Sequence, residues 1–219
     1  MPECFFMNDL KYRYITIEGC IGAGKTTLAR LLSNDFHTCL ILEQFEENSF
    51  LPKFYKDPAR FAFPLELSFL ADRFQQLKTQ VINLDLFHPN IVADYHIQKS
   101  LIFARKTLQE DEFSLFMRVY QIMIAQLPVP DLYVYLYLPV DRLLENIKKR
   151  GRPYEQNITG EYLSRIQESY FDFLRQQTNL RIVVIDTRAI DFVENRADYE
   201  WLVSVINAEY PIGISNITL

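Results

Sequence analysis

The segment at residues 19–27, Gly-Cys-Ile-Gly-Ala-Gly-Lys-Thr-Thr, matches the phosphate-loop pattern G-x-x-x-x-G-K-[ST]. Its glycines let the backbone curl so that N–H groups face a polyphosphate at a helix N-terminus, where the helix dipole also favours an anion. Lys25 is expected to bridge the terminal phosphates and Thr26 to coordinate magnesium. A helix-capping glycine turn with an incidental lysine is the ordinary alternative. The predicted triphosphate-binding residues are Gly19, Gly22, Ala23, Gly24, Lys25, Thr26 and Thr27.

A predicted strand at residues 90–94 ends in a carboxylate, Asp94, which can hold the magnesium ion directly or through water. An acidic residue at the end of a strand is common, and by itself it is explained equally well as a turn residue. A phosphate loop in the same chain favours the metal site. Thr26 and Asp94 are therefore the predicted magnesium ligands.

Two arginines flank a glycine where a predicted helix ends, at Arg150, Gly151 and Arg152. Favourable interaction with the helix dipole explains Arg150 alone but not Arg152. A mobile lid near 149–157 that places both guanidinium groups on a transferring phosphoryl group explains both, because such transfer is catalysed chiefly by positioning and charge stabilisation. The predicted catalytic cations are Lys25, Arg150 and Arg152.

The elements that must position these residues follow from the alternation of short β-branched and aromatic runs with helical patterns. This alternation predicts a mostly parallel sheet with helices on both faces, and ligands collect at the carboxyl ends of the strands in such folds. The five predicted strands are residues 12–18, 39–43, 90–94, 132–137 and 181–186. Acidic residues end four of them, so four carboxylates are expected at that edge. They are Glu18, Glu43, Asp94 and Asp186.

The length and composition fit one domain, residues 1–219, of which 49% are hydrophobic and 14% aromatic. The net charge of −5 argues against extended binding to nucleic acid or anionic membranes, which needs a basic face. The three scattered cysteines lack metal-ligand spacing. The longest nearly apolar stretch, 132–140, is far shorter than the roughly 20 residues of a membrane-spanning helix, and no signal-peptide pattern is present. A cytoplasmic location is therefore predicted.

Several stretches, the phosphate loop among them, form a pattern that is more specific than the loop alone. They are residues 17–27, 43–45, 54–58, 65–77, 93–104 and 150–155. In these stretches, which together span most of the chain, the sequence resembles the deoxynucleoside kinase family, and specifically its bacterial purine branch. The resemblance implies a P-loop NTPase-type three-layer α/β fold with a five-stranded parallel sheet, ATP as the phosphoryl donor, Mg²⁺ as the cofactor, and a homodimer joined through helices.

Individual roles carry over by the same resemblance. Glu43 matches the carboxylate that removes the proton from the sugar 5′-hydroxyl, and a general base contributes about 10² to 10⁴ in rate. Tyr55 and Glu155 match the pair that hydrogen-bonds the sugar 3′-hydroxyl, and Phe103 matches an aromatic residue that stacks on the base. The ordinary alternative for Glu43, a solvated acid after a strand, is the weaker reading. Without the family pattern, Tyr55 is equally well explained as a buried tyrosine whose hydroxyl ties a loop, and Phe103 is most simply a core residue.

The choice of base is expected to depend on Glu66 and Arg73, seven residues apart and hence two turns, about 10 Å, along one face of a predicted helix. Many family members have glutamine where this chain has Glu66. Guanine offers two adjacent donors that a carboxylate accepts together, while Arg73 can donate to O6 and N7. Adenine presents one donor beside an acceptor, so deoxyguanosine is the expected substrate, with deoxyadenosine and deoxyinosine next. On spacing alone, an exposed helical ion-pair face is the alternative.

The chain departs from the family pattern at residues 94–96, which read Asp-Tyr-His where an acidic residue, arginine and serine are usual. Tyr95 thus replaces an arginine that would steady the base and phosphate. Its role is expected to fall to one of three other residues, Arg73, Arg150 or Arg152. Lys99 and Ser100 occupy the region where many members place a base-contacting aspartate.

Two other functions stay open at this point. Thymidylate kinases have a similar phosphate loop and arginine-bearing lid but need extra cations for an acceptor phosphate, and Tyr95 in place of an arginine disfavours that acceptor. A nucleotide-binding structural subunit would keep the fold without the chemistry. An intact set of site residues disfavours that alternative. The set is Lys25, Thr26, Glu43 and Asp94.

Overall fold

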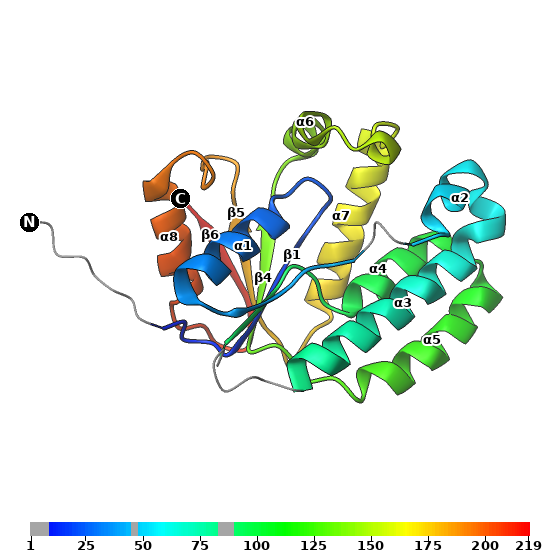
Figure 1. Ribbon diagram of the computed structural model, residues 1–219, viewed down its shortest axis with the longest axis horizontal. Coiled ribbons are helices and arrows are strands. Elements are labelled where there is room, and N and C mark those ends of the chain that lie inside the picture. The colour runs from blue at the N-terminus through cyan, green and yellow to red at the C-terminus, as the bar shows by residue number, and fades with distance from the viewer. Residues whose placement is uncertain (1–8, 45–47, 83–89) are drawn as a thin grey trace, which may run out of the picture.

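Six parallel strands form a single sheet among the residues that the computed structural model describes (Figure 1). The described residues are 9–44, 48–82 and 90–219. Phe45, the last residue of one matching stretch, lies outside them. The order across the sheet is β2-β3-β1-β4-β5-β6, and every neighbouring pair is parallel. The strands are β1 (Tyr14–Gly19), β2 (Cys39–Ile41), β3 (Ile91–Ala93), β4 (Leu132–Tyr137), β5 (Arg181–Asp186) and β6 (Gly213–Thr218).

The prediction of a mostly parallel sheet is confirmed, but the described chain has six strands rather than the expected five. The additional strand, β6, pairs with β5 and forms the edge of the sheet within the described residues. Its side chains alternate between half-buried and exposed, and its sequence, Gly-Ile-Ser-Asn-Ile-Thr, mixes polar with apolar residues. An edge strand of this kind carries a weak hydrophobic signal, which is why the sequence pattern did not reveal it.

Helices cover both faces of the sheet, as the three-layer prediction requires. In Figure 1, α1 and α8 lie on one side of the strands, and α3, α4, α5 and α7 lie on the other. No helix in the described part of the chain is long and apolar enough to cross a membrane. The helices are α1 (Lys25–Phe36), α2 (Leu51–Lys56), α3 (Pro58–Ile82), α4 (Gln98–Thr107), α5 (Glu110–Ile124), α6 (Val140–Arg150), α7 (Gly160–Arg175) and α8 (Arg196–Ile206), with a 3-10 turn at Pro153–Glu155.

The central strands are buried on both faces, as is typical of a parallel sheet between helices. All six residues of β1 are buried, and two neighbouring ones pack into different clusters. Ile15 joins a larger cluster together with Leu28 of α1, whereas Tyr14 joins a smaller one together with Leu70 of α3. This double burial fixes the direction and register of β1, the strand that leads into the phosphate loop.

A crevice at the carboxyl edge of the sheet follows from the strand order. The chain places β3 on one side of β1 and β4 on the other, so the strand order reverses at β1, where doubly wound folds bind ligands. A short loop separates the end of β1 from the start of α1, and α4 begins a few residues after β3. The first turns of both helices therefore border the same crevice.

Candidate active site

The phosphate loop joins β1 to α1 in a conformation that only glycine adopts readily. Gly22 and Gly24 have φ angles of 88° and 89°, in the left-handed region. A Cβ atom on Gly22 would also lie 2.7 Å from the carbonyl oxygen of Leu143. Asn146 of α6 donates a 2.8 Å hydrogen bond to the carbonyl oxygen of Gly22. The loop is thus held by both backbone geometry and a neighbouring helix.

Lys25, the first residue of α1, folds back over this loop, where its Nζ donates to the carbonyl oxygen of Cys20 at 2.9 Å. Burial, followed by the positive charge of Lys99, lowers the pKa of Lys25 to about 8. A polyphosphate bound beside Lys25 would supply negative charge that restores the protonated form, because an adjacent anion favours the charged state of a lysine.

Asp94 joins the phosphate loop to the segment after β2. Its Oδ2 accepts a 2.5 Å hydrogen bond from the Thr26 hydroxyl, and its Oδ1 accepts one from the Glu43 N–H at 2.8 Å. The described residues contain no group of three or more metal-ligating side chains. Mg²⁺ typically takes one or two protein oxygens and completes its shell with phosphate oxygens and water, so the Thr26–Asp94 pair fits this ion.

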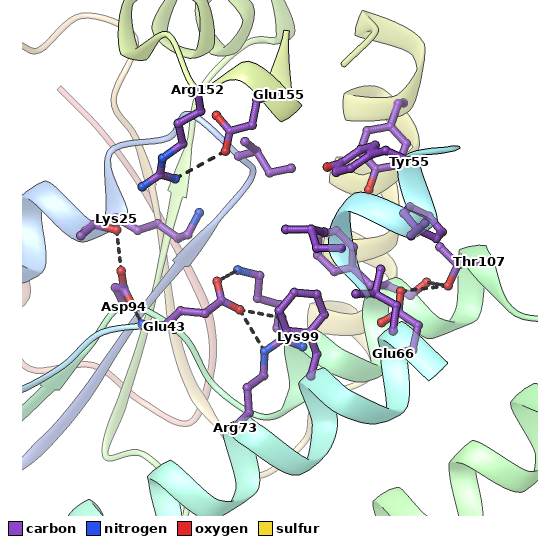
Figure 2. A pocket seen from close by; sticks show the side chains of 18 of the residues that line it. Lys25, Glu43, Tyr55, Glu66, Arg73, Asp94, Lys99, Thr107, Arg152 and Glu155 are labelled. Atoms are coloured by element: carbon purple, nitrogen blue, oxygen red, sulfur yellow. Dashed lines mark hydrogen bonds and ion pairs between the residues drawn. The ribbon is translucent and has the colours of Figure 1, made fainter. Parts of the chain in front are cut away.

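Glu43 lies between two cations. Arg73 of α3 donates to Glu43 Oε1 through Nε at 2.9 Å and Nη2 at 2.6 Å, and Lys99 of α4 approaches Oε2 at 2.5 Å (Figure 2). Burial alone would raise the pKa of Glu43, but Lys99 and then Arg73 hold that pKa well below its usual range. Glu43 is therefore ionised at neutral pH and fixed in orientation.

The pairing of Lys99 with Glu43 was not predicted from the sequence, which pointed to arginines as substitutes for the one missing at Tyr95. Tyr95 is buried in the core, where its hydroxyl donates to Gln76 at 2.6 Å, so it does not line the site. Lys99, four residues later, brings an ammonium group to Glu43 instead. A recognisable signal exists in the spacing of Lys99, Phe103 and Thr107, which places them on one face of α4, and all three line the same cavity.

Glu66 of α3 is buried, with 3% of its surface exposed, and accepts a 3.0 Å hydrogen bond from the hydroxyl of Thr107. Burial raises the pKa of Glu66 to about 7, against the opposing effects of Arg73 and Thr107. The Arg73 guanidinium, expected to share a base edge with Glu66, donates to Glu43 and, at 2.6 Å, to Ser100. Arg73 therefore orients the carboxylate near the phosphate loop as well as lining the cavity.

The predicted lid residues converge on one acid. Helix α6 ends at Arg150, and Gly151 reverses the chain with a φ of 73°. Glu155, in the 3-10 turn, accepts hydrogen bonds from Arg150 Nε at 3.0 Å and Nη2 at 2.6 Å, and from Arg152 Nη1 at 3.4 Å. Glu155, which the family resemblance assigns to sugar binding, therefore pairs with both arginines that were predicted to stabilise the phosphoryl group.

One cavity brings most of the predicted residues together. A second hollow lies along the phosphate loop and is bordered by residues of α6 and of the segment after β5. Lining the first are Lys25, Thr26, Glu43, Tyr55, Glu66, Arg73, Asp94, Phe103, Arg150, Arg152 and Glu155. Lining the second are Gly22, Ala23, Gly24 and Thr27, together with Arg150.

Two of the four strand-end acids lie outside the cavity. Glu18 is buried in β1, where it accepts hydrogen bonds from the His96 N–H at 2.9 Å and the Tyr170 hydroxyl at 3.0 Å. Asp186, at the end of β5, pairs with Arg188 at 2.5 Å. Gly19 lines neither hollow, because it closes β1 beneath the loop, where a Cβ atom would lie 2.7 Å from the Leu136 carbonyl oxygen.

Comparison with known proteins agrees with this geometry. The model of the family described as deoxynucleoside kinase matches residues 15–210. A deoxyguanosine kinase of Bacillus subtilis (strain 168) is 37% identical over 191 residues, covering 85% of this chain and 92% of that protein. A deoxyadenosine kinase of Dictyostelium discoideum is 32% identical, covering 96% and 84% respectively. The structure of deoxyadenosine kinase from M. mycoides with bound dATP superposes with a TM-score of 0.77 at 26% identity, covering 89% of this chain and 100% of that one.

Proposed function

This chain belongs to the deoxynucleoside kinase family, and from that membership we propose that it transfers the γ-phosphoryl group of ATP to the 5′-hydroxyl of a purine deoxyribonucleoside. It is an enzyme that phosphorylates deoxynucleosides, as its family and its relatives named as kinases indicate. Deoxyguanosine is the proposed first substrate and deoxyadenosine the second. The product is the nucleoside 5′-monophosphate, the form in which a salvaged deoxyribonucleoside enters the nucleotide pool.

The observation that carries the proposal is the placement of Glu43 beside the phosphate loop in one cavity. Lys25 and Thr26 line the cavity on one side, and Glu43 is tied to Thr26 through Asp94. A hydroxyl group that hydrogen-bonds Glu43 therefore faces the terminal phosphate of a nucleotide on the loop. This near-attack arrangement is what phosphoryl transfer needs, because its transition state is stabilised mainly by positioning and charge.

The proposed reaction uses groups of this chain in distinct roles. The sugar 5′-oxygen forms a bond to the γ-phosphorus, the bond from that phosphorus to the bridging oxygen of ADP breaks, and Glu43 accepts the hydroxyl proton. Lys25, Arg150 and Arg152 stabilise the negative charge on the transferring group. Thr26 and Asp94 would hold Mg²⁺, which when bound neutralises charge on the phosphate oxygens.

The pairing of cations in the cavity favours an uncharged acceptor over a nucleoside monophosphate. Arg73 and Lys99 pair with Glu43, while both lid arginines pair with Glu155. Lys25 is placed for the donor nucleotide. An acceptor phosphate would have to compete with these acids for its cations, so thymidylate kinase activity is the weaker proposal.

The remaining assignments are proposals of the same kind. The second hollow, bordered by Arg142, Asn146 and residues 187–194, suits the adenosine part of ATP, with its phosphates on the loop. The two hollows share Arg150, which therefore lies where donor and acceptor would meet. A homodimer through helices is also proposed; Leu115 and Ile122 of α5 expose 42% and 67% of their surfaces. The molar mass in solution tests that assembly.

A panel of the four common deoxyribonucleosides with Mg²⁺ and ATP tests the proposed substrate. We expect deoxyguanosine to have the highest kcat/KM at pH 8, followed by deoxyadenosine, because Glu66 can accept both guanine donors. Thymidine monophosphate serves as the added comparison. Equal or better turnover of thymidine or deoxycytidine would remove the purine assignment, and turnover of thymidine monophosphate would reverse the order of the two enzyme classes.

Replacing Lys99 with methionine is expected to lower kcat by about tenfold to a hundredfold, because it removes a charge-assisted hydrogen bond that orients Glu43. It should also move the acidic limb of the kcat–pH profile to higher pH, since Lys99 contributes most to lowering the pKa of Glu43. Lys99→Arg, which keeps the charge, is the matched control and should retain most of the activity. A Lys99→Met enzyme with an unchanged kcat and an unchanged acidic limb would rule out this role.

A further inference from the structure

The Glu66 carboxyl group lies across the cavity from Lys25 (Figure 2) and has an unusually sparse polar environment. Within the described residues, its hydrogen bond comes from the Thr107 hydroxyl, and it forms no ion pair. Arg73, two turns away on the same helix, donates instead to Glu43 and Ser100. A buried carboxyl group without a salt bridge has little to stabilise its charge.

Ionisable groups reach the cavity from the other elements around Glu66 as well. Burial raises the pKa of Tyr162 of α7, and the nearby Tyr55 and Glu66 raise it further. Burial and the Lys99 charge lower the pKa of Lys25 to about 8, so Lys25 is the other cavity group placed to titrate near neutral pH. The charged and ionisable groups lining the cavity with Glu66 are Arg73, Lys99, Tyr55, Tyr162, Glu155, Arg150, Arg152, Glu43, Asp94 and Lys25.

We propose that the charge of the Glu66 carboxyl group decides which purine the chain accepts, guanine when the group is ionised and adenine when it is protonated. This inference rests on the proposed function, because it concerns the same deoxyribonucleoside site. It makes Glu66 a specificity-determining residue with two recognition patterns rather than one.

The two patterns follow from the donors and acceptors of the purines. An ionised carboxylate only accepts hydrogen bonds, which suits the adjacent N1–H and N2–H₂ donors of guanine. A protonated carboxyl group has one O–H donor beside one carbonyl acceptor. That pair complements adenine, whose N1 accepts and whose N6–H₂ donates. Protonated Glu66 thus presents the same pair of one donor group and one acceptor as a glutamine side-chain amide.

The environment of Glu66 makes both forms available near neutral pH. Burial raises the pKa of the group to about 7, and the Arg73 charge and the Thr107 hydrogen bond oppose this rise. Lys25 acts on the phosphoryl donor, which is common to both reactions. A change in its charge therefore alters both rates together and cancels in the ratio of kcat/KM for deoxyguanosine to kcat/KM for deoxyadenosine.

That ratio, measured by direct competition between about pH 5.5 and 8.5, is the test of the proposal. We expect it to rise at least about tenfold across this range, because each form of the carboxyl group leaves a buried donor or acceptor unmatched against the other purine. A ratio that stays constant while both nucleosides are phosphorylated would overturn the role of Glu66 and leave the proposed function intact. Failure to phosphorylate either nucleoside would instead contradict the proposed function.

Three variants sharpen the result. Glu66→Gln should give a ratio that no longer varies with pH and that favours deoxyadenosine throughout. Thr107→Val removes the hydrogen bond that lowers the Glu66 pKa, so the midpoint of the ratio should move to higher pH. Thr107→Ser keeps the hydroxyl and is the matched control, with a midpoint near that of the parent. If Thr107→Val and Thr107→Ser are both folded and the midpoint of the ratio does not move in Thr107→Val, the role proposed for Glu66 is contradicted.

Thermal unfolding gives a readout that does not depend on activity. Between about pH 4.5 and 7 an unfolded Glu66 has lost its proton while the folded protein keeps it, so the parent loses stability as pH rises through this window. The melting temperature of Glu66→Gln relative to the parent should therefore increase with pH across the window. A difference that is independent of pH would show that the folded and unfolded carboxyl groups titrate alike.

Discussion

Replacing Glu43 with glutamine is expected to lower kcat at least about a hundredfold while the affinity for ATP is retained. Glutamine keeps the size of the side chain and one oxygen that can accept from Arg73, but it cannot take a proton from the 5′-hydroxyl. ATP is proposed to lie on Lys25 and Thr26, so its binding should not depend on this proton acceptor. The measurement is a coupled ADP-release assay together with an ATP titration.

The control for Glu43→Gln is Glu161→Gln, which changes the same chemical group on the exposed surface of α7, outside both hollows. It should have parental kcat and KM. Because Arg73 and Lys99 lose a negative partner in Glu43→Gln, the melting temperature of that variant must be measured alongside. A folded Glu43→Gln enzyme with parental turnover would exclude Glu43 as the base.

Lys25→Met is expected to lower kcat/KM for ATP by about a thousandfold, because one preorganised positive group on a transferring phosphoryl is worth about that much. The same variant should lose the rise in melting temperature that Mg²⁺ and ATP give the parent. Without nucleotide it should be at least as stable as the parent at pH 7. The folded pKa of Lys25 is lowered from 10.5 to about 8 by burial and by Lys99, so its charge destabilises the folded state below pH 8.

These two readouts separate function from folding. A Lys25→Met protein that unfolds at a much lower temperature without nucleotide would mean that the lysine supports the fold. One that keeps the nucleotide-dependent rise in melting temperature and the parental kcat/KM would show that the triphosphate lies elsewhere. Lys25→Arg is the matched control for charge, and it should recover part of the nucleotide-dependent stabilisation.

The parts of the site that sequence predicted well are local. The phosphate loop is a contiguous motif, and its residues 19–27 connect a strand and a helix as predicted. Asp94 follows β3 directly, so the strand alone brings it to the sheet edge beside Thr26. Glu66 and Arg73 share one helix. In each case a short-range rule, either the loop spacing or the helical repeat, was enough to place the residue on its element.

The parts that sequence did not predict depend on contacts between distant segments. Glu43 pairs with Lys99, 56 residues later in the chain, and no local sequence pattern links the two residues. The sequence suggested arginines as replacements for the one missing at Tyr95, and it did not reveal that Tyr95 lies in the core while Lys99 adds a further cation to the cavity. Likewise, the hydrogen bonds from Arg73 to Glu43 and Ser100 depend on the packing of α3 against α4, which the sequence does not show.

The most direct test of the account is to identify where the γ-phosphate of ATP goes. Purified protein is incubated with Mg²⁺, deoxyguanosine and ATP labelled in its γ-phosphate, and the labelled product is identified. We expect one equivalent of deoxyguanosine 5′-monophosphate for each ADP formed. Label released as inorganic phosphate, or no transfer to any deoxyribonucleoside, would contradict a site in which Glu43 presents a sugar hydroxyl to a nucleotide on residues 19–27.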